Sequence, residues 1–134
     1  MAEIIVQLPS REFVDIDQMF TRHPETGNVM LKKKQNAVKQ SVLNLLQLRK
    51  WDKPFHPEIS SPIYDYLFEL STPAIRMILE SEVEKYISAN EPRYVVTNVT
   101  VSFPDAHTIK CELEGTLVNT TEPFTIVYFV NRIR

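Results

Sequence analysis

The spacing of apolar residues changes once along this chain, at Asn90-Glu91-Pro92-Arg93, and this change limits the fold more than any other feature. Before it, apolar residues recur every three or four positions, which is typical of amphipathic helices. After it they alternate, which is typical of strands with one buried face. Helices first and strands last predict an α+β fold, in which a three-stranded antiparallel C-terminal sheet packs on about three helices.

Two stretches show the helical spacing clearly. The first is expected to begin at Asn36, a residue that can cap a helix N-terminus, and to end near Trp51. Its apolar stripe contains Val38, Val42, Leu45 and Leu46. The second begins at Thr72-Pro73 and is expected to stop at a left-handed Asn90. Its stripe contains Ile75, Ile78, Leu79, Val83, Tyr86 and Ile87, and its polar side contains Arg76, Glu80, Glu84 and Lys85.

The segment WDKPFHPEISSP between these helices contains three prolines and predicts a stiff loop, because each proline biases the preceding residue toward extended backbone. Trp51 and Phe55 are expected to fold back from this loop onto the core. Ser61-Pro62 then indicates the start of a short helix that carries Ile63, Tyr64, Leu67 and Phe68.

The N-terminal region carries weaker signals. Residues 1–12 are interpreted as an arm, and residues 13–134 as a single domain. HPETGN predicts a turn, since Pro24 fixes φ and Gly27 permits positive φ. With the short apolar run Val29-Met30-Leu31, this predicts a small hairpin or an extended region.

Three strands are expected after Arg93. The faces predicted to be buried contain Val95, Thr97, Val99, Val101 and Phe103 in the first strand and Ile109, Cys111, Leu113 and Leu117 in the second. The third strand has Phe124, Ile126, Tyr128 and Val130 on one face and Val127 and Phe129 on the other. A strand that is apolar on both faces requires cover on both. In so small a domain, we expect another molecule to supply part of that cover.

Composition and motifs exclude several function classes. A net charge of −2 gives no field to hold nucleic acid, and no apolar stretch is long enough to span a bilayer. One cysteine excludes an intrachain disulfide framework. No cofactor or metal motif is present, and the carboxylates Glu58, Asp65, Glu69 and Glu91 form no pair that 17 acidic residues would not offer by chance. We expect no cofactor, no metal, no nucleic acid and no membrane.

Glu91, Pro92 and Arg93 leave two hypotheses open. In an extended segment, residues 91 and 93 lie on one side and present a carboxylate and a five-donor guanidinium together. Such a pair would suit docking to a partner. The alternative is a helix stop whose charges pair locally and weakly.

Four segments, in their order and spacing, resemble the GPW-like family of baseplate wedge proteins of contractile-tailed phages, also called lysozyme-like. They are DIDQMF…HPETGNVMLKKKQNAVKQSVLNLL, KPFHPEISSPIYDYLFE, STP and NEPRYVVTNVTV. The resemblance spans residues 13–134. It implies a non-enzymatic virion protein of the tail baseplate, assembled in the bacterial host cytoplasm, that joins the wedge to the sheath and starts sheath assembly.

The resemblance also implies the partners and their sites. A sheath protein would add a strand to the C-terminal sheet, at Phe124, Ile126, Val127, Tyr128, Phe129 and Val130. The helical core bundle of the wedge would contact Glu91, Pro92 and Arg93. On this basis Arg93→Ala is expected to leave the fold nearly intact but to stop incorporation into baseplates. The alternatives are a lysozyme-like peptidoglycan hydrolase and a homologue from the type VI secretion baseplate.

Overall fold

The structure is a computed structural model that describes residues 12–132. The chain divides into two units, which meet in sequence between Ala37 and Val38, and each is described by itself. No helix among the described residues is both long enough and apolar enough to cross a membrane. The expectation of one domain over residues 13–134 stays a prediction.

The first unit contains a small antiparallel hairpin, as the sequence predicted. Strands β1 (Val14–Ile16) and β2 (Leu31–Lys33) pair with Val14 opposite Lys33. The predicted turn is present, since the Gly27 N–H donates to the His23 carbonyl at 3.0 Å and Gly27 has a φ of 72°. The sequence alternatives of hairpin and extended region are therefore resolved in favour of the hairpin.

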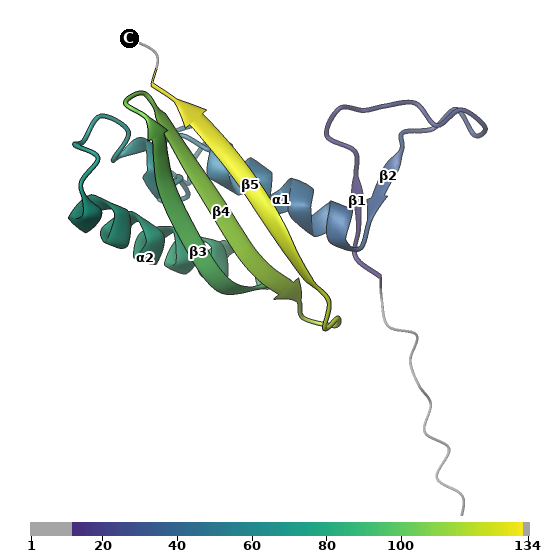
Figure 1. Cartoon of the computed structure of the whole chain (residues 1–134). Helices are drawn as coiled ribbons and strands as arrows, with labels where there is room; N and C mark the ends of the chain where they lie inside the picture. Colours follow the sequence, from purple (N-terminus) through teal and green to yellow (C-terminus); the bar gives the residue numbers. More distant parts are fainter. Residues whose placement is uncertain (1–11, 133–134) are drawn as a thin grey trace, which may run out of the picture. The chain divides into compact units, whose positions relative to one another are not determined.

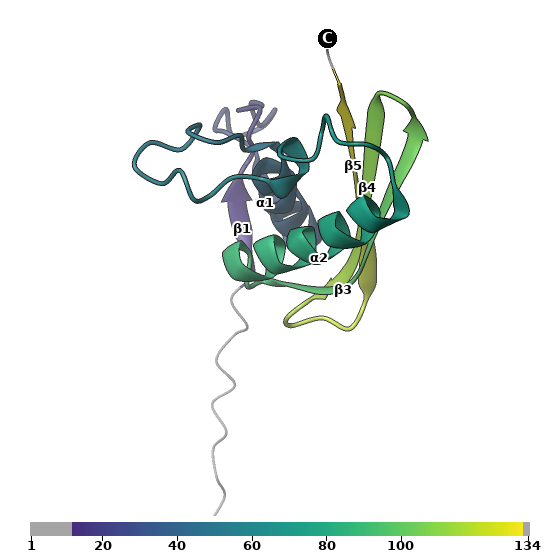
Figure 2. The ribbon, with the colours of Figure 1, turned by 90° about the vertical axis from the view of Figure 1, so that its left-hand side faces the viewer.

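The second unit is an antiparallel sheet covered on one face by helices (Figures 1 and 2). Its strands are β3 (Tyr94–Asp105), β4 (Thr108–Leu117) and β5 (Pro123–Asn131), in the order β3-β4-β5. The helices are α1 (Gln35–Gln47), which begins in the first unit, and α2 (Pro73–Asn90). The α+β class is as predicted. The third helix is only a single 3-10 turn, η1 (Pro62–Tyr64), so "about three helices" was an overestimate.

The core lies between the helices and the sheet, and most of the predicted stripes form it. The fully buried side chains include Val38, Val42, Leu46, Leu79, Val83, Ile87, Ile109, Cys111, Leu113 and Ile126. The alternation predicted for β4 is confirmed over its whole length. Thr72 caps α2 as expected, because its hydroxyl accepts the Ile75 N–H at 3.3 Å and Pro73 occupies the first turn.

The predicted face of β3 is wrong at its start. The pairing with β4 shifts between Val96 and Asn98, so Thr97 is an extra residue of a β-bulge. One extra residue reverses the alternation, and therefore Val95 is exposed while Tyr94 is buried. Beyond the bulge, Val99 and Val101 are buried as predicted.

The ends of the helices also differ from the predictions. The helix α1 begins at Gln35, so Asn36 lies inside its first turn. It ends at Gln47 rather than near Trp51, because the chain turns away: the Ser61 N–H donates to the Leu48 carbonyl at 2.8 Å. Asn90 is not left-handed; it is the last residue of α2, and its side-chain amide donates to the Tyr86 carbonyl at 2.8 Å.

Trp51 and Phe55 do not fold back onto the core. Their exposed fractions are 70% and 94%, and their φ angles are 74° and 66°. The loop closes on itself through short-range backbone bonds, such as Asp52 N–H to the Arg49 carbonyl at 3.1 Å. These left-handed residues and local bonds leave both rings in solvent, where the prediction had placed them in the core.

Candidate functional site

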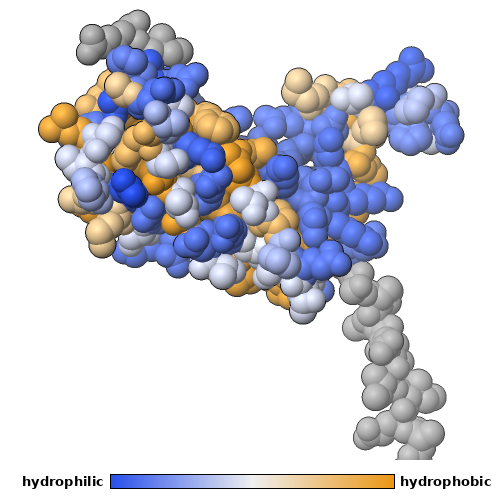
Figure 3. Space-filling view, viewed as in Figure 1, coloured by the Kyte–Doolittle hydropathy of each residue, from blue (hydrophilic) through white to orange (hydrophobic). Residues whose placement is uncertain are grey.

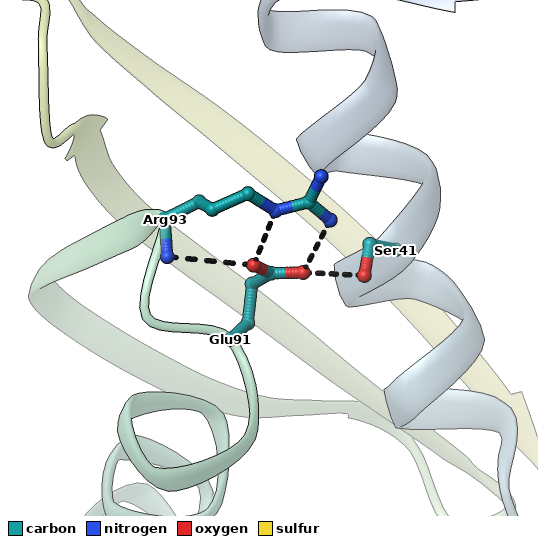
Figure 4. A network of polar contacts seen from close by, with 3 residues as sticks. All are labelled: Ser41, Glu91 and Arg93. Carbon is teal, nitrogen blue, oxygen red and sulfur yellow. Dashed lines mark hydrogen bonds and ion pairs between the residues drawn. The ribbon is translucent and has the colours of Figure 1, made fainter. Parts of the chain in front are cut away.

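Glu91 and Arg93 form a partly buried ion pair next to α1 (Figure 4). The Arg93 Nε donates to Glu91 Oε1 at 2.7 Å, and Nη2 donates to Oε2 at 2.9 Å, which is the two-pronged geometry of a strong arginine–carboxylate pair. The Ser41 hydroxyl donates to the same carboxylate from α1. The residue Glu91 is 3% exposed, whereas the Arg93 side chain is 26% exposed. We call these three residues the Glu91 cluster.

A tight turn between α2 and β3 brings the pair together. The Glu91 N–H closes the end of α2 by donating to the Ile87 carbonyl at 2.8 Å, and the Tyr94 N–H donates to the Glu91 carbonyl at 3.2 Å. The backbone is therefore a turn and not the extended segment that was expected. The two side chains do lie on one side, but they face Ser41, and Pro92 is the exposed member of the triplet.

The electrostatics of the cluster favour the charged carboxylate. Burial by itself raises the pKa of Glu91. The hydrogen bonds from Arg93 and Ser41, together with the charge of Arg93, outweigh this effect and leave the pKa below its ordinary value. Glu91 thus links the end of α2, the start of β3 and the side of α1, and the local pairing is neither exposed nor weak.

The strand β5 is the last strand of the sheet within residues 12–132, so one of its edges has no strand beside it. Just beyond β5, the Arg132 N–H donates toward β4, to the His107 carbonyl at 2.6 Å. Backbone groups in an antiparallel pair alternate between the two edges. The N–H and C=O groups of Thr125, Val127 and Phe129 therefore point away from β4. We call these outward backbone groups the β5 edge.

The six residues proposed for strand addition fall into two sets. Ile126 and Val130 are buried in the core, and Phe124 and Tyr128 are half-buried on the same face. Val127 and Phe129 lie on the opposite face and are 39% and 57% exposed. Figure 3 shows apolar surface among hydrophilic side chains over β4 and β5 on this outer face. Only Val127 and Phe129 combine an exposed apolar side chain with outward backbone groups.

The inner face of β5 is fastened to the covering layer. The hydroxyls of Tyr128 and Tyr64 are 3.0 Å apart, and the Arg49 guanidinium lies 5.1 Å from the centre of the Tyr64 ring. Burial, followed by the contact with Tyr64, raises the pKa of Tyr128. The edge strand is thereby anchored through η1, which contains Tyr64.

At the opposite edge of the sheet, β3 is contacted by Glu80 of α2, which the sequence pattern placed only on the polar side of that helix. Glu80 of α2 accepts the backbone N–H of Val101 in β3 at 2.9 Å. Helical spacing identifies which side of α2 Glu80 occupies, but not what that side contacts. No sequence signal pointed to this bond.

The ligand types that metal ions prefer do not gather at one place in the described part of the chain. No group of three or more His, Cys, Asp or Glu residues there is placed to hold a metal ion. Cys111 is buried as predicted, and burial, with the nearby Glu80 and Glu112 charges, raises its pKa to about 12. The thiol is therefore protonated and shielded at neutral pH.

Together, these features define a small α+β domain with an ion pair at the turn after α2 and a three-stranded sheet in which β5 is an edge strand. Residues 32–122 match the family described as baseplate wedge protein gp25, and the chain belongs to that family of contractile phage tails. The resemblance inferred from the sequence motifs is thus confirmed.

Individual relatives agree with this assignment. The chain is 29% identical over 85 residues to baseplate wedge protein gp25 of Enterobacteria phage T4. That match covers 62% of this chain and 64% of the T4 protein, so it spans a little under two thirds of the relative.

Two solved structures share the fold. One chain, named as a tail lysozyme from Geobacter sulfurreducens, superposes with a TM-score of 0.65 at 21% identity over 72% of this chain and 89% of that one. A chain of the anti-feeding prophage baseplate gives a TM-score of 0.62 at 18% identity, over 92% and 88%. At these identities the likeness concerns the fold.

Proposed function

We propose that this protein is a non-enzymatic subunit of the baseplate wedge that links the wedge to the tail sheath and starts sheath assembly. It works as part of the virion and is assembled in the host cytoplasm. The observation that carries the proposal is the open β5 edge, which offers backbone donors and acceptors next to exposed apolar side chains. An extended arm of a sheath protein adds there as a further strand.

The chemistry of this edge indicates what kind of strand it would accept. Outward N–H and C=O groups bind any extended backbone, and so they provide affinity without selecting a sequence. Selection comes from side chains beside the new strand, which on the outer face are Val127 and Phe129. Aromatic or β-branched residues at every second position of the arm would pair best with them.

The wedge contact is proposed at the turn after α2. Pro92 and the exposed part of Arg93 face the helical core bundle of the wedge, and the Glu91 carboxylate holds the guanidinium in place. Glu91 itself is nearly inaccessible and so acts as a positioning residue rather than a contact. A secretion-system homologue would use the same surfaces, and genomic neighbours distinguish it from a phage protein.

Val127→Pro is expected to block sheath assembly while leaving the fold and wedge binding in place. Proline removes one outward N–H and no bond to β4, which is why it is tolerated on edge strands. Complemented tails are examined by electron microscopy, and wedge binding is measured by copurification. The number of sheathed tails should fall at least about tenfold. One of the few main-chain hydrogen bonds to the arm is lost, and the proline ring displaces the bonds next to it.

Val127→Thr is the matched control, because it keeps the N–H and the β-branched shape. It is expected to assemble sheaths normally. If Val127→Pro also gives normal sheathed tails, the β5 edge does not receive the sheath. If wedge binding is lost together with sheath assembly and the far-ultraviolet circular dichroism changes, the variant is misfolded, and Val127→Lys, which keeps the backbone donor and adds a charge beside Phe129, repeats the test.

A lysozyme activity is the alternative that the name of one structural neighbour suggests. Glycosidases of this type need one carboxyl group with a raised pKa. The pKa values of Glu58 and Glu91, two of the acids considered from the sequence, are both lowered, which is the opposite of what a general acid needs. We therefore expect the purified protein to cause no clearing of a peptidoglycan suspension. Clearing that disappears when one carboxylate is replaced would establish the alternative.

A further inference from the structure

The two edges of the sheet differ in whether their outward backbone groups have hydrogen-bond partners. Just after β4, the Val118 N–H donates to the Arg93 carbonyl at 3.1 Å. Backbone groups alternate between the two sides of a strand, so the N–H and C=O groups of every second residue of β4, counted back from Val118, point toward β3. Beyond the bulge, the residues of β3 that pair with these residues of β4 are Asn98, Thr100 and Ser102. Val99 and Val101 consequently direct their backbone groups away from β4, to the outer edge of β3.

At that outer edge the Val101 N–H is already occupied. Glu80 reaches it from α2, and its Oε1 accepts the bond at 2.9 Å. Val101 is buried and Glu80 is half-buried, so the bond is partly shielded from water. A strand arriving at β3 would have to displace a charge-assisted hydrogen bond and leave a carboxylate without its donor, which is costly.

If the β3 edge could also accept a strand, the free subunit would be able to polymerise, because the β5 edge accepts strands too. Two different complementary edges on one molecule make head-to-tail contacts that do not close, and such contacts produce open-ended fibres. With one edge guarded, edge-to-edge association of the free subunit cannot go beyond a pair. Covering an edge strand with a neighbouring element is one way in which proteins prevent this kind of assembly.

We propose that Glu80 closes the β3 edge, so that strand addition is confined to β5 and the subunit does not polymerise with itself. This inference rests on the proposed function only in taking β5 as the accepting edge; the role of Glu80 is read from its own bond. Glu80 acts as a specificity-determining residue: it decides which edge can accept an extended chain.

Self-association of the full chain tests the proposal. Sedimentation velocity is measured over a concentration series for the wild type, Glu80→Ala, Glu80→Asp and Glu80→Gln. Alanine removes the acceptor and aspartate is one methylene too short to reach Val101, so both variants are expected to form species whose mass grows with concentration beyond a dimer. Glutamine keeps an Oε1 acceptor and should behave as the wild type, which is expected not to exceed a dimer.

Hydrogen exchange provides an independent measurement. In the wild type, the Val101 amide should be protected although it lies at a sheet edge, and Glu80→Ala or Glu80→Asp should accelerate its exchange by about tenfold or more. Unprotected Val101 in the wild type would overturn the proposal without any variant. So would a Glu80→Asp protein that exposes Val101 but stays no larger than a dimer at every concentration.

The double variant Glu80→Asp with Val127→Pro separates this inference from the proposed function. If the polymers join β3 of one copy to β5 of the next, the second substitution should restore the mass of the wild type. Polymers that persist unchanged in the double variant would contradict edge-to-edge growth. Normal sheath assembly by Val127→Pro alone would refute the sheath-docking role of β5, whereas a dimer-limited Glu80→Asp would refute only the guard role of Glu80.

Discussion

Replacing Glu91 with alanine is expected to lower the free energy of unfolding by about 2–3 kcal/mol, less than the loss of one partner of a fully buried ion pair, because the Arg93 side chain is 26% exposed. The change leaves the Arg93 guanidinium and the Ser41 hydroxyl without their shared acceptor at the point where α1, α2 and β3 meet. Urea unfolding of the purified chain measures the loss. Ser41→Ala is the milder comparison, because it removes one hydrogen bond and no charge. A loss in Glu91→Ala no larger than in Ser41→Ala would contradict a structural role for the ion pair.

The same cluster predicts how stability depends on pH. Because the pKa of Glu91 is lower in the folded protein than its ordinary value of 4.5, its ionised form stabilises the fold. This contribution is complete above about pH 5 and is lost as the pH falls through the native pKa. Glu91→Gln removes the titrating group. The gap in stability between wild type and Glu91→Gln should therefore shrink as the pH is lowered below 4.5.

The Glu91 cluster also changes the expected result for Arg93→Ala. The sequence alone suggested that this variant keeps its fold and fails only in assembly. In the structure it would remove the arginine from a nearly buried carboxylate that keeps its hydrogen bond from Ser41, so part of any assembly defect would come from lost stability. Pro92 is the better position for testing the wedge contact, because it is exposed.

Gly115→Ala is expected to cost about 3 kcal/mol or more of stability, at the upper end of the usual penalty for overpacking. A Cβ at Gly115 would lie 2.3 Å from the Val95 carbonyl oxygen and 2.8 Å from Cζ of the Tyr94 ring. The first of these is a backbone atom of β3 next to the β-bulge, and Val95 pairs with Thr116, so this atom cannot move aside without disturbing the β3–β4 pairing. Thermal unfolding followed by circular dichroism measures the effect.

Gly27→Ala is the matched control for this prediction. Gly27 also gains a Cβ, but in an exposed turn where the nearest atom is the end of the flexible Arg22 side chain at 3.2 Å. Its positive φ alone makes the change unfavourable, by about 1 kcal/mol. Equal losses at Gly27 and Gly115 would mean that the β-bulge tolerates the extra atom.

The strands show how far alternation carries a sequence-based prediction. In β4 every expected inward residue is buried, because its pairing with β5 is continuous. In β3 the alternation was assigned correctly at Val99 and Val101 and wrongly at Val95, since a bulge adds a residue that the pattern does not contain. Gly115, one of only two glycines, stands opposite the bulge and was the available signal for it.

The helices and the loop show a different limit. Periodicity placed Leu79, Val83 and Ile87 in the core correctly, because these positions depend only on the helix itself. The contacts of Glu80 and Glu91 depend on which strand and which helix lie nearby, and this is tertiary information. The exposure of Trp51 and Phe55 depends on left-handed backbone at both residues, which neither side chain favours.

If β5 receives a sheath arm as proposed, the Tyr64–Tyr128 contact has a consequence for the kinetics of sheath assembly. This contact and the buried Ile126 and Val130 side chains fasten β5 to the layer that covers the sheet. The strand would therefore lose little conformational entropy when an extended arm adds to it. Nearly all of the ordering cost then falls on the incoming arm. Tyr64→Phe removes the hydroxyl contact and would loosen β5, so that β5 shares the entropy cost of ordering. This would slow the formation of the first sheath ring rather than the addition of later sheath rings.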